Sequence, residues 1–345
     1  MLSSNLQPYV RASDSIILPD VQQLQGQYYS ASFELMKLMP AKLMLDDAEQ
    51  KGLLTPETTV VESSSGTFAL GLAILCAERG YKLIIVGDDA IDSGLKNRLL
   101  DLGAHLDIVS ADEGGGGIQQ VRLNKLYSWL ETEKNAFWPK QYENPCNPES
   151  YYMAAEHVLE KIGAVDYLVA SIGSGGSSQG MTKAMRMINP KMKLIGVDSV
   201  RSIIFGRQDG RRLLRGLGSS ILPANVDYEL FDQVHWLECA EGFFATRKLH
   251  REHQLFMGPT SGSTYLVGQW IADQYKDAKV LSIFPDKGHR YINTAYSDEW
   301  LKENDIFTEH VGTPLKLNHP SDPTDGWCYY DWNEQTYDQA TGGAK

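Results

Sequence analysis

The sequence predicts an α/β fold whose mostly parallel sheets are divided between two blocks. Short apolar runs alternate with helical segments along most of the 345 residues, and parallel strands require such crossover connections. The alternation is interrupted between Gln141 and Tyr152, where the two blocks would meet. We therefore expect two three-layer α/β/α domains with a ligand cleft between them.

The first block is expected to follow an irregular N-terminal stretch. Pro40 can occupy the first position of a helix that Gly52 would stop. Apolar periodicity then predicts strands over 58–62, 81–87 and 105–110 and helices over 66–80 and 93–103. Gly114 to Gly117 cannot hold regular structure and predict a surface loop.

The second block repeats the alternation. It predicts helices over 156–163, 178–189, 242–255 and 264–276 and strands over 166–173, 193–198 and 279–286. The periodicity is lost beyond Phe307, although the later segment carries the aromatic residues Trp327, Tyr329, Tyr330 and Trp332. We expect an irregular extension that packs on the body of the protein or on a partner subunit, because these side chains are too apolar for a solvated tail.

Charge and composition exclude several classes of partner. The net charge of −12 would repel nucleic acid and anionic membranes. No apolar run approaches the roughly 18 residues that a membrane span needs, and the N-terminus has no secretory pattern. The four cysteines lie far apart without metal-ligand spacing. These features predict a cytoplasmic protein with reduced thiols and no metal site.

The glycine-rich turn SIGSGGSSQG, from Ser171 to Gly180, is the strongest local signal. It follows an apolar strand and opens a helix. The N–H groups of Gly175, Gly176 and Ser177 can point at phosphate oxygens where the helix dipole favours negative charge. The alternative is a tight turn that binds nothing.

Two phosphate ligands suit this turn. A dinucleotide is one, because Gly173, Gly175 and Ser178 approximate G-x-G-x-x-G and Asp198 closes the next strand. Pyridoxal 5′-phosphate (PLP) is the other and needs a lysine amine. Lys37 suits this role, since its apolar neighbours in FELMKLMP favour the free amine. It could equally be a lysine whose charged end reaches solvent.

Two more hydroxyl-rich turns are candidates for ligand contacts. ESSSGTF, from Glu62 to Phe68, lies between a predicted strand and helix and could hold a carboxylate. Alternatively, Ser64 or Ser65 could simply cap the helix. GPTSGSTY, from Gly258 to Tyr265, allows the same two interpretations.

Taken in order, these segments resemble the fold-type II PLP enzymes, the cysteine synthase and cystathionine β-synthase group, from about Ser32 to Phe307. The resemblance implies the tryptophan synthase β-subunit type of fold and a homodimer. It also implies a larger cofactor-binding domain formed by residues 1–44 and 151–310, and a smaller mobile domain formed by residues 45–150. Residues 311–345 would be an irregular extension.

The resemblance also assigns roles to individual residues, with Lys37 as the catalytic Schiff-base lysine. The cofactor contacts it implies are Lys37, Thr67, Gly173, Ser174, Gly175, Gly176, Ser177 and Thr260, with Ser261 as a second choice for the ring nitrogen. The substrate contacts it implies are Ser64, Ser65, Gly66, Gln141 and Gly216. PDKGHRY, from Pro285, matches the family's closing motif.

Some segments are more specific, and others depart from the family pattern. RSIIFG, RGLGSSILP and PDKGHRYINTAYSDEWL look most like the siderophore-pathway branch, the N-(2-amino-2-carboxyethyl)-L-glutamate synthases, which couple O-phosphoserine to glutamate. Leu38 and Met39 replace a charged pair, Thr67 an asparagine and Phe68 a hydroxyl residue. LQGQYYSAS replaces the usual N-terminal strand region. These departures lie near the reacting carbon and leave the substrate open.

The resemblance implies β-replacement on serine or an O-activated serine such as O-phosphoserine or O-acetylserine. Lys37 would remove the α-proton, loss of the leaving group would give an aminoacrylate, and a sulfur or amine nucleophile would add at the β-carbon. Three alternatives remain: PLP-dependent β-elimination or deamination, a dinucleotide-binding reductase, and a PLP-binding subunit that has lost catalysis.

An arginine cluster is the last candidate feature. Arg207, Arg211, Arg212 and Arg215 lie close together in an otherwise acidic sequence. We hypothesise that they receive an anionic leaving group or an acidic co-substrate. The alternative is a solvated basic loop.

Overall fold

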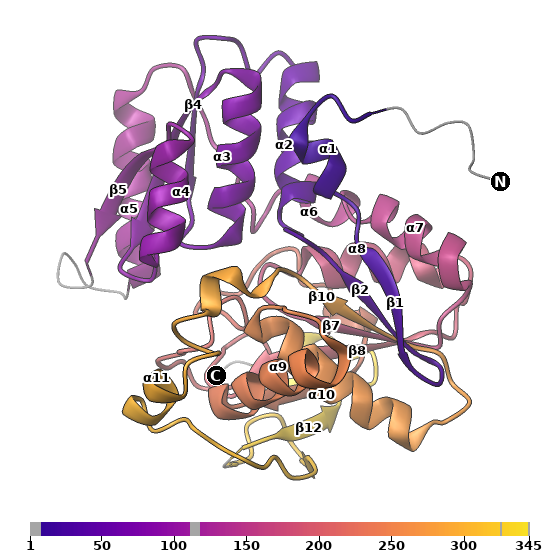
Figure 1. The fold of residues 1–345 in the computed structure, drawn as a ribbon. Coiled ribbons are helices and arrows are strands. Elements are labelled where there is room, and N and C mark those ends of the chain that lie inside the picture. Colours follow the sequence, from indigo (N-terminus) through magenta and orange to yellow (C-terminus); the bar gives the residue numbers. More distant parts are fainter. Residues whose placement is uncertain (1–7, 111–117, 325, 344–345) are drawn as a thin grey trace.

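The chain is built around two separate sheets, one of eight strands and one of four (Figure 1). The computed structural model describes residues 8–110, 118–324 and 326–343. The glycines at 114–117, predicted as a surface loop, lie outside these residues. No helix in the described segments is both long enough and apolar enough to cross a membrane.

The four-stranded sheet is entirely parallel, in the order β5-β4-β3-β6. Its strands are β3 (Thr59–Ser63), β4 (Lys82–Asp88), β5 (His105–Val109) and β6 (Ala136–Phe137). Its helices are α2 (Leu38–Gln50), α3 (Thr67–Arg79), α4 (Ser93–Asp101) and α5 (Ile118–Thr132). Alternate strand residues face opposite sides, so Val60 and Ile85 pack with α3 while Val61 and Val86 pack with α5. The predicted elements from 58 to 110 are confirmed, whereas α5 and β6 were not predicted.

The eight-stranded sheet has the order β1-β2-β10-β7-β8-β9-β12-β11. Its strands are β1 (Asp20–Gln25), β2 (Tyr28–Ser32), β7 (Tyr167–Ser171), β8 (Lys193–Ser199), β9 (Phe231–Leu237), β10 (Val280–Phe284), β11 (Leu315–Lys316) and β12 (Cys328–Asp331). The five central strands from β2 to β9 are parallel.

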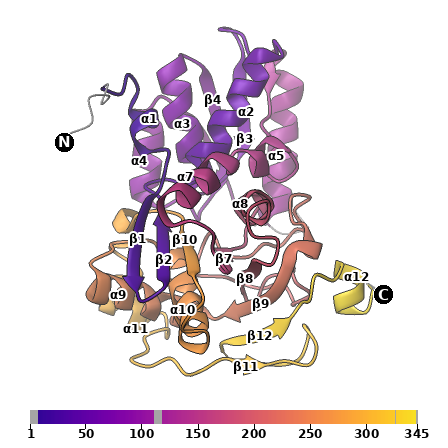
Figure 2. The same cartoon turned by 90° about the vertical axis from the view of Figure 1, so that its right-hand side faces the viewer.

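Helices cover both faces of this sheet (Figure 2). Helices α7 (Tyr152–Ile162) and α8 (Gly176–Arg186) lie on the face toward the smaller sheet, and α9 (Cys239–His253) and α10 (Pro259–Gln274) lie on the other. The short helices are α1 (Ala12–Ile16), α6 (Cys146–Glu149), α11 (Asp298–Glu303), α12 (Tyr337–Thr341) and the 3₁₀ turns η2 (Tyr228–Leu230) and η3 (Gly288–Tyr291).

The N-terminal stretch, expected to be irregular, is instead a β-hairpin. Strands β1 and β2 pair antiparallel from Asp20 with Ser32, and β2 pairs in parallel with β10. LQGQYYSAS therefore supplies the strand region that it was expected to replace. The glutamines of the largely solvent-facing β1 leave no apolar run in the sequence, so periodicity does not identify it.

The expectation of an irregular extension over 311–345 is also wrong in part. Strand β12 pairs antiparallel with β9, and β11 continues the sheet beyond it. Trp332 is fully buried and stacks edge to face on Phe205. The extension therefore packs on the body of the protein, as the aromatic content suggested, but it does so as part of the larger sheet.

Replacement of the Trp332 side chain by alanine tests whether this extension is an integral part of the fold. Because Trp332→Ala removes a fully buried indole, we expect it to lower the free energy of unfolding by about 3 to 5 kcal/mol in denaturant titrations. Leu315→Ala, at an exposed position of β11, is the matched control and should change it by less than about 0.5 kcal/mol. Equal effects of the two variants would show that the extension is only loosely attached.

Candidate active site

A cavity of about 550 Å³ lies between the two sheets. Many of the residues that line it follow β3 and β4 in the smaller sheet and β7, β8 and β10 in the larger one. The carboxyl ends of parallel strands from both sheets therefore open into one space, which is where α/β proteins place their ligands.

Lys37 stands at the N-terminus of α2, with its side chain in this cavity. Helix α3 packs closely on its backbone, because a Cβ added to Gly71 would lie 3.0 Å from the Lys37 carbonyl oxygen. The Lys37 Nζ atom donates a hydrogen bond to Ser174 Oγ at 2.9 Å. Burial lowers the pKa of Lys37 to about 8. The amine can therefore act as a nucleophile or a base near neutral pH.

The glycine-rich turn between β7 and α8 forms a second wall. Gly173, Ser174, Gly175 and Ser177 line the cavity. Gly175 has a φ of +83° and precedes α8, so the positive end of an 11-residue helix begins at the wall. Gly176 does not line the cavity, although it was predicted to contact the cofactor. Its missing Cβ makes room for Asn147, whose Oδ1 would lie 2.0 Å from that atom.

The ESSSGTF loop forms the wall on the side of the smaller sheet. Ser64, Ser65, Gly66, Thr67 and Phe68 all line the cavity. Ser65 Oγ accepts hydrogen bonds from Arg122 Nη1 at 2.8 Å and from the Asp88 backbone N–H at 3.0 Å. Because two donors occupy the oxygen, the hydroxyl proton of Ser65 is left to donate to a third group.

Most, but not all, of the other predicted residues line the cavity. Gln141, Gly216 and Thr260 line the cavity. Ser261, the second choice for the ring nitrogen, is fully buried behind the wall, and its hydroxyl has no hydrogen-bond partner among the described residues.

Only part of the predicted arginine cluster lines the cavity. Arg211, Arg212 and Arg215 line the cavity, whereas Arg207 does not. The Arg207 guanidinium lies 4.8 Å from the centre of the Trp236 ring and donates to the Asp322 carbonyl oxygen, so it attaches the C-terminal extension.

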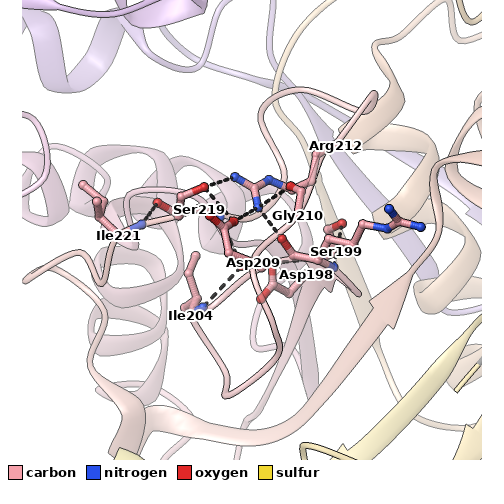
Figure 3. A network of polar contacts seen from close by, with 11 residues as sticks. Asp198, Ser199, Ile204, Asp209, Gly210, Arg212, Ser219 and Ile221 are labelled. Atoms are coloured by element: carbon pink, nitrogen blue, oxygen red, sulfur yellow. Dashed lines mark hydrogen bonds and ion pairs between the residues drawn. The ribbon is translucent and has the colours of Figure 1, made fainter. Parts of the chain in front are cut away.

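Arg212 braces its own loop (Figure 3). Its Nη1 donates to Asp209 Oδ1 at 2.9 Å and its Nη2 donates to Ser220 Oγ at 2.7 Å. Arg211 and Arg215, by contrast, form no ion pair with any described residue. The braced loop therefore presents two positive charges at the cavity that have no ion-pair partner among the described residues.

Sequence reasoning missed several lining residues, including Asp88, Arg122 and Asp286. Arg122 lies 3.3 Å from Asp88 in a buried ion pair and comes from the unpredicted helix α5. Burial raises the pKa of Asp286 to about 6, and Tyr291 donates a hydrogen bond to its Oδ2 at 2.8 Å. PDKGHRY contains both Asp286 and Tyr291, so that motif was the available signal for this pair.

A family described as "Pyridoxal-phosphate dependent enzyme" matches residues 31–286. The chain belongs to this family. It is 30% identical over 272 residues to the N-(2-amino-2-carboxyethyl)-L-glutamate synthase of Cupriavidus metallidurans, covering 77% of this chain and 80% of that protein.

Solved structures agree on the fold. An O-acetylserine dependent cystathionine beta-synthase from Helicobacter pylori has a TM-score of 0.77 and 24% identity, covering 84% of this chain and 99% of that one. A hydrogen sulfide-producing enzyme from Fusobacterium nucleatum has a TM-score of 0.75 and 24% identity, covering 82% and 100% of the two chains. This PLP enzyme thus has the fold-type II architecture.

The residues present fit PLP. The cavity supplies one buried amine for the aldehyde, from Lys37, and a glycine-rich helix N-terminus for the phosphate. The dinucleotide interpretation is wrong. Asp198, its proposed ribose ligand, is fully buried away from the cavity and accepts a hydrogen bond from the Ser199 N–H at 2.7 Å.

The lowered pKa of Lys37 predicts a distinctive labelling profile for this PLP enzyme. In the cofactor-free protein, reaction of Lys37 with an amine reagent should be half-maximal near pH 8, because the free amine predominates above its pKa. Lys51 should require a higher pH, because its hydrogen bond with Asp47 raises its pKa. Peptide mapping by mass spectrometry distinguishes the two lysines. The same profile at both positions would contradict the burial of the Lys37 amine.

Proposed function

We propose that this PLP enzyme catalyses β-replacement on an O-activated serine, with a sulfur or amine nucleophile entering at the β-carbon. The observation that carries the proposal is that a reactive amine and groups suited to binding anions line the same cavity. The Lys37 amine faces it from the start of α2, and the ESSSGTF loop and the arginines form its other walls. The Helicobacter pylori relative, described as O-acetylserine dependent, and the relative described as an N-(2-amino-2-carboxyethyl)-L-glutamate synthase support the same chemistry.

Lys37 is the proposed base. When bound, PLP supplies an electron sink that weakens the bond between the α-carbon and its hydrogen. The Lys37 amine, with its pKa near 8, can hold that proton and return it later to the same carbon. Its hydrogen bond to Ser174 fixes one side of the amine and so limits the directions from which it can act.

The ESSSGTF loop is the proposed site for the substrate carboxylate. The loop precedes α3, a 13-residue helix whose N-terminal amides favour an anion. Ser65 adds a hydroxyl proton that its two donor neighbours leave available. Gln141 lies in the same cavity and completes the proposed carboxylate contacts.

The arginine wall favours an anionic donor or an acidic co-substrate. Arg211 and Arg215 have no ion pair among the described residues, although Asp88, which pairs with Arg122, also attracts Arg215. A phosphate leaving group or a second carboxylate would meet positive charge here. O-phosphoserine is therefore the first donor to test, and glutamate is the first amine.

Three further proposals follow from the family resemblance. Residues 1–44 and 151–310 would form the larger cofactor-binding domain and residues 45–150 a smaller mobile one. The enzyme would be a homodimer and would act in the cytoplasm.

Replacement of Lys37 tests the central assignment. Lys37→Ala should abolish turnover and the visible absorption band of the lysine-bound cofactor, because no amine remains to hold it. Lys42→Ala is the matched control, since Lys42 lies on the same helix, pairs with Asp46 and does not line the cavity. Full activity of Lys37→Ala would refute the mechanism.

A substrate screen distinguishes replacement from elimination. The holoenzyme is incubated with serine, O-acetylserine or O-phosphoserine, with and without sulfide or glutamate, and the products are identified by mass spectrometry. We expect a substituted alanine only when donor and nucleophile are both present. Release of pyruvate and ammonia at the same rate without a nucleophile would instead support β-elimination.

The arginine wall predicts donor discrimination. Neutralising both positions in Arg211→Gln/Arg215→Gln should raise the KM for O-phosphoserine about 10-fold and leave that for O-acetylserine within about 2-fold, because only the former carries the phosphate charge. Arg98→Gln, on the exposed face of α4 and away from the cavity, is the control. Equal changes in KM for the two donors would mean that these arginines contact the nucleophile or only face solvent.

A further inference from the structure

Asn147 lies at the start of α6 and is fully buried just behind the cavity wall. Its side-chain Nδ2 donates to the Gln141 carbonyl oxygen at 2.5 Å and to Ser174 Oγ at 3.1 Å. A backbone carbonyl can only accept hydrogen bonds, so the nitrogen end of the amide must face Gln141. Both amide hydrogens are thus used within the site.

The hydroxyl of Ser174 is flanked by two donors. Lys37 Nζ approaches its oxygen at 2.9 Å and Asn147 Nδ2 approaches it at 3.1 Å. A hydroxyl offers two lone pairs and one proton. With both lone pairs occupied, the proton of Ser174 is directed to a third group, and Ser174 lines the cavity. An acceptor oxygen bound there would receive it.

Packing holds Asn147 in this position. A Cβ added to Gly176 would meet Asn147 Oδ1 at 2.0 Å, so α8 begins directly against the amide. The following turn is equally close, because a Cβ on Gly180 would lie 1.9 Å from the Pro148 carbonyl oxygen. The start of α8 therefore lies close against the Oδ1 side of the amide and restricts its movement away from Ser174.

Asn225 provides a natural comparison. Its Nδ2 also donates to the Gln141 carbonyl oxygen, at 3.2 Å, but its second contact is with the Asn144 carbonyl oxygen. It has no hydrogen bond with Ser174 among those of the described residues. Two amides thus support the same carbonyl group, and only Asn147 also reaches the hydroxyl beside Lys37.

We propose that Asn147 is a positioning residue that orients the Ser174 hydroxyl proton toward an anionic oxygen in the cavity and keeps Ser174 an acceptor for the Lys37 amine. The proposed ligand group is a phosphate ester oxygen, as PLP carries. This proposal rests on the assignment of Lys37 to the cofactor in the proposed function, and it is independent of the donor and the nucleophile.

The first test replaces the Asn147 amide, which donates a hydrogen bond to Ser174, with a carboxylate, which can only accept one. In Asn147→Asp, the new carboxylate would accept the Ser174 proton and place negative charge near Lys37, which raises the pKa of the amine. We expect the pH midpoint for Lys37 labelling in the cofactor-free protein to rise by about 1 unit or more. Asn225→Asp adds the same charge to the other amide that supports Gln141 and should shift the midpoint less.

The second test measures the cofactor directly. Because Asn147→Ala frees the Ser174 hydroxyl to turn, we expect PLP affinity to fall about 10-fold in fluorescence titrations of the cofactor-free protein. Asn147→Ser is the parallel variant if the alanine protein does not fold. Asn225→Ala, which leaves Ser174 untouched, should retain tighter PLP binding than Asn147→Ala.

Specific outcomes would overturn the proposal. An unchanged Lys37 midpoint in Asn147→Asp, together with unchanged PLP affinity in the alanine or serine variant, would leave Asn147 with a packing role only. Equal losses in the Asn147 and Asn225 variants would assign the effect to the Gln141 segment. Lys37→Ala separates these results from a failure of the proposed function, because it tests the role of Lys37 in activity and in the visible band without changing Asn147 or Ser174.

Discussion

The hydrogen bond between Lys37 and Ser174 is the contact around which the site is organised. It joins the start of α2 to the turn before α8, two segments separated by more than a third of the chain. The amine must be shielded enough for its pKa to fall, yet it must still face the cavity. Close packing of α3 against the Lys37 backbone and of α8 against Asn147 satisfies both requirements. The geometry around the Lys37 amine is therefore a property of helix packing as much as of the cavity residues.

Strand periodicity predicted the framework well where strands are buried on both faces. The runs that became β3, β4, β7, β8 and β10 each contain consecutive apolar residues, as is typical of parallel strands between helices. Strand β1 escaped prediction because it is mostly exposed and rich in glutamine. Strand β12 escaped because its stability comes from pairing with β9 almost a hundred residues earlier, which no local pattern records.

The site was predictable where one turn carries the chemistry, and not where distant elements share it. Lys37 and the turns beginning at Ser64 and Gly173 could be found from their local sequences. The place of Arg122 in the site could not be predicted from its local sequence, because it depends on α5 bringing Arg122 Nη1 to 2.8 Å from Ser65 Oγ. Gly176 shows a further limit: a glycine in a phosphate-binding pattern was predicted to contact the cofactor, and the structure shows in addition that its missing side chain accommodates Asn147. Sequence patterns identify where a backbone must come close to something without identifying what it approaches.

Some of the departures from the family pattern lie in the core, and others line the cavity. Leu38 and Met39 are buried in the main core and do not line the cavity, so they alter the packing beneath Lys37 rather than the groups that a substrate meets. Thr67 and Phe68 do line it, at the start of α3. Phe68 places an aromatic ring where the family pattern has a hydroxyl, so the carboxylate contacts proposed above come from Ser64, Ser65 and the helix amides. With arginines on the facing loop, the cavity combines a reduced set of hydroxyl contacts on one side with excess positive charge on the other. The substrate preference of this chain should therefore depend more on the charge of the donor or nucleophile than on the hydroxyl pattern of its family.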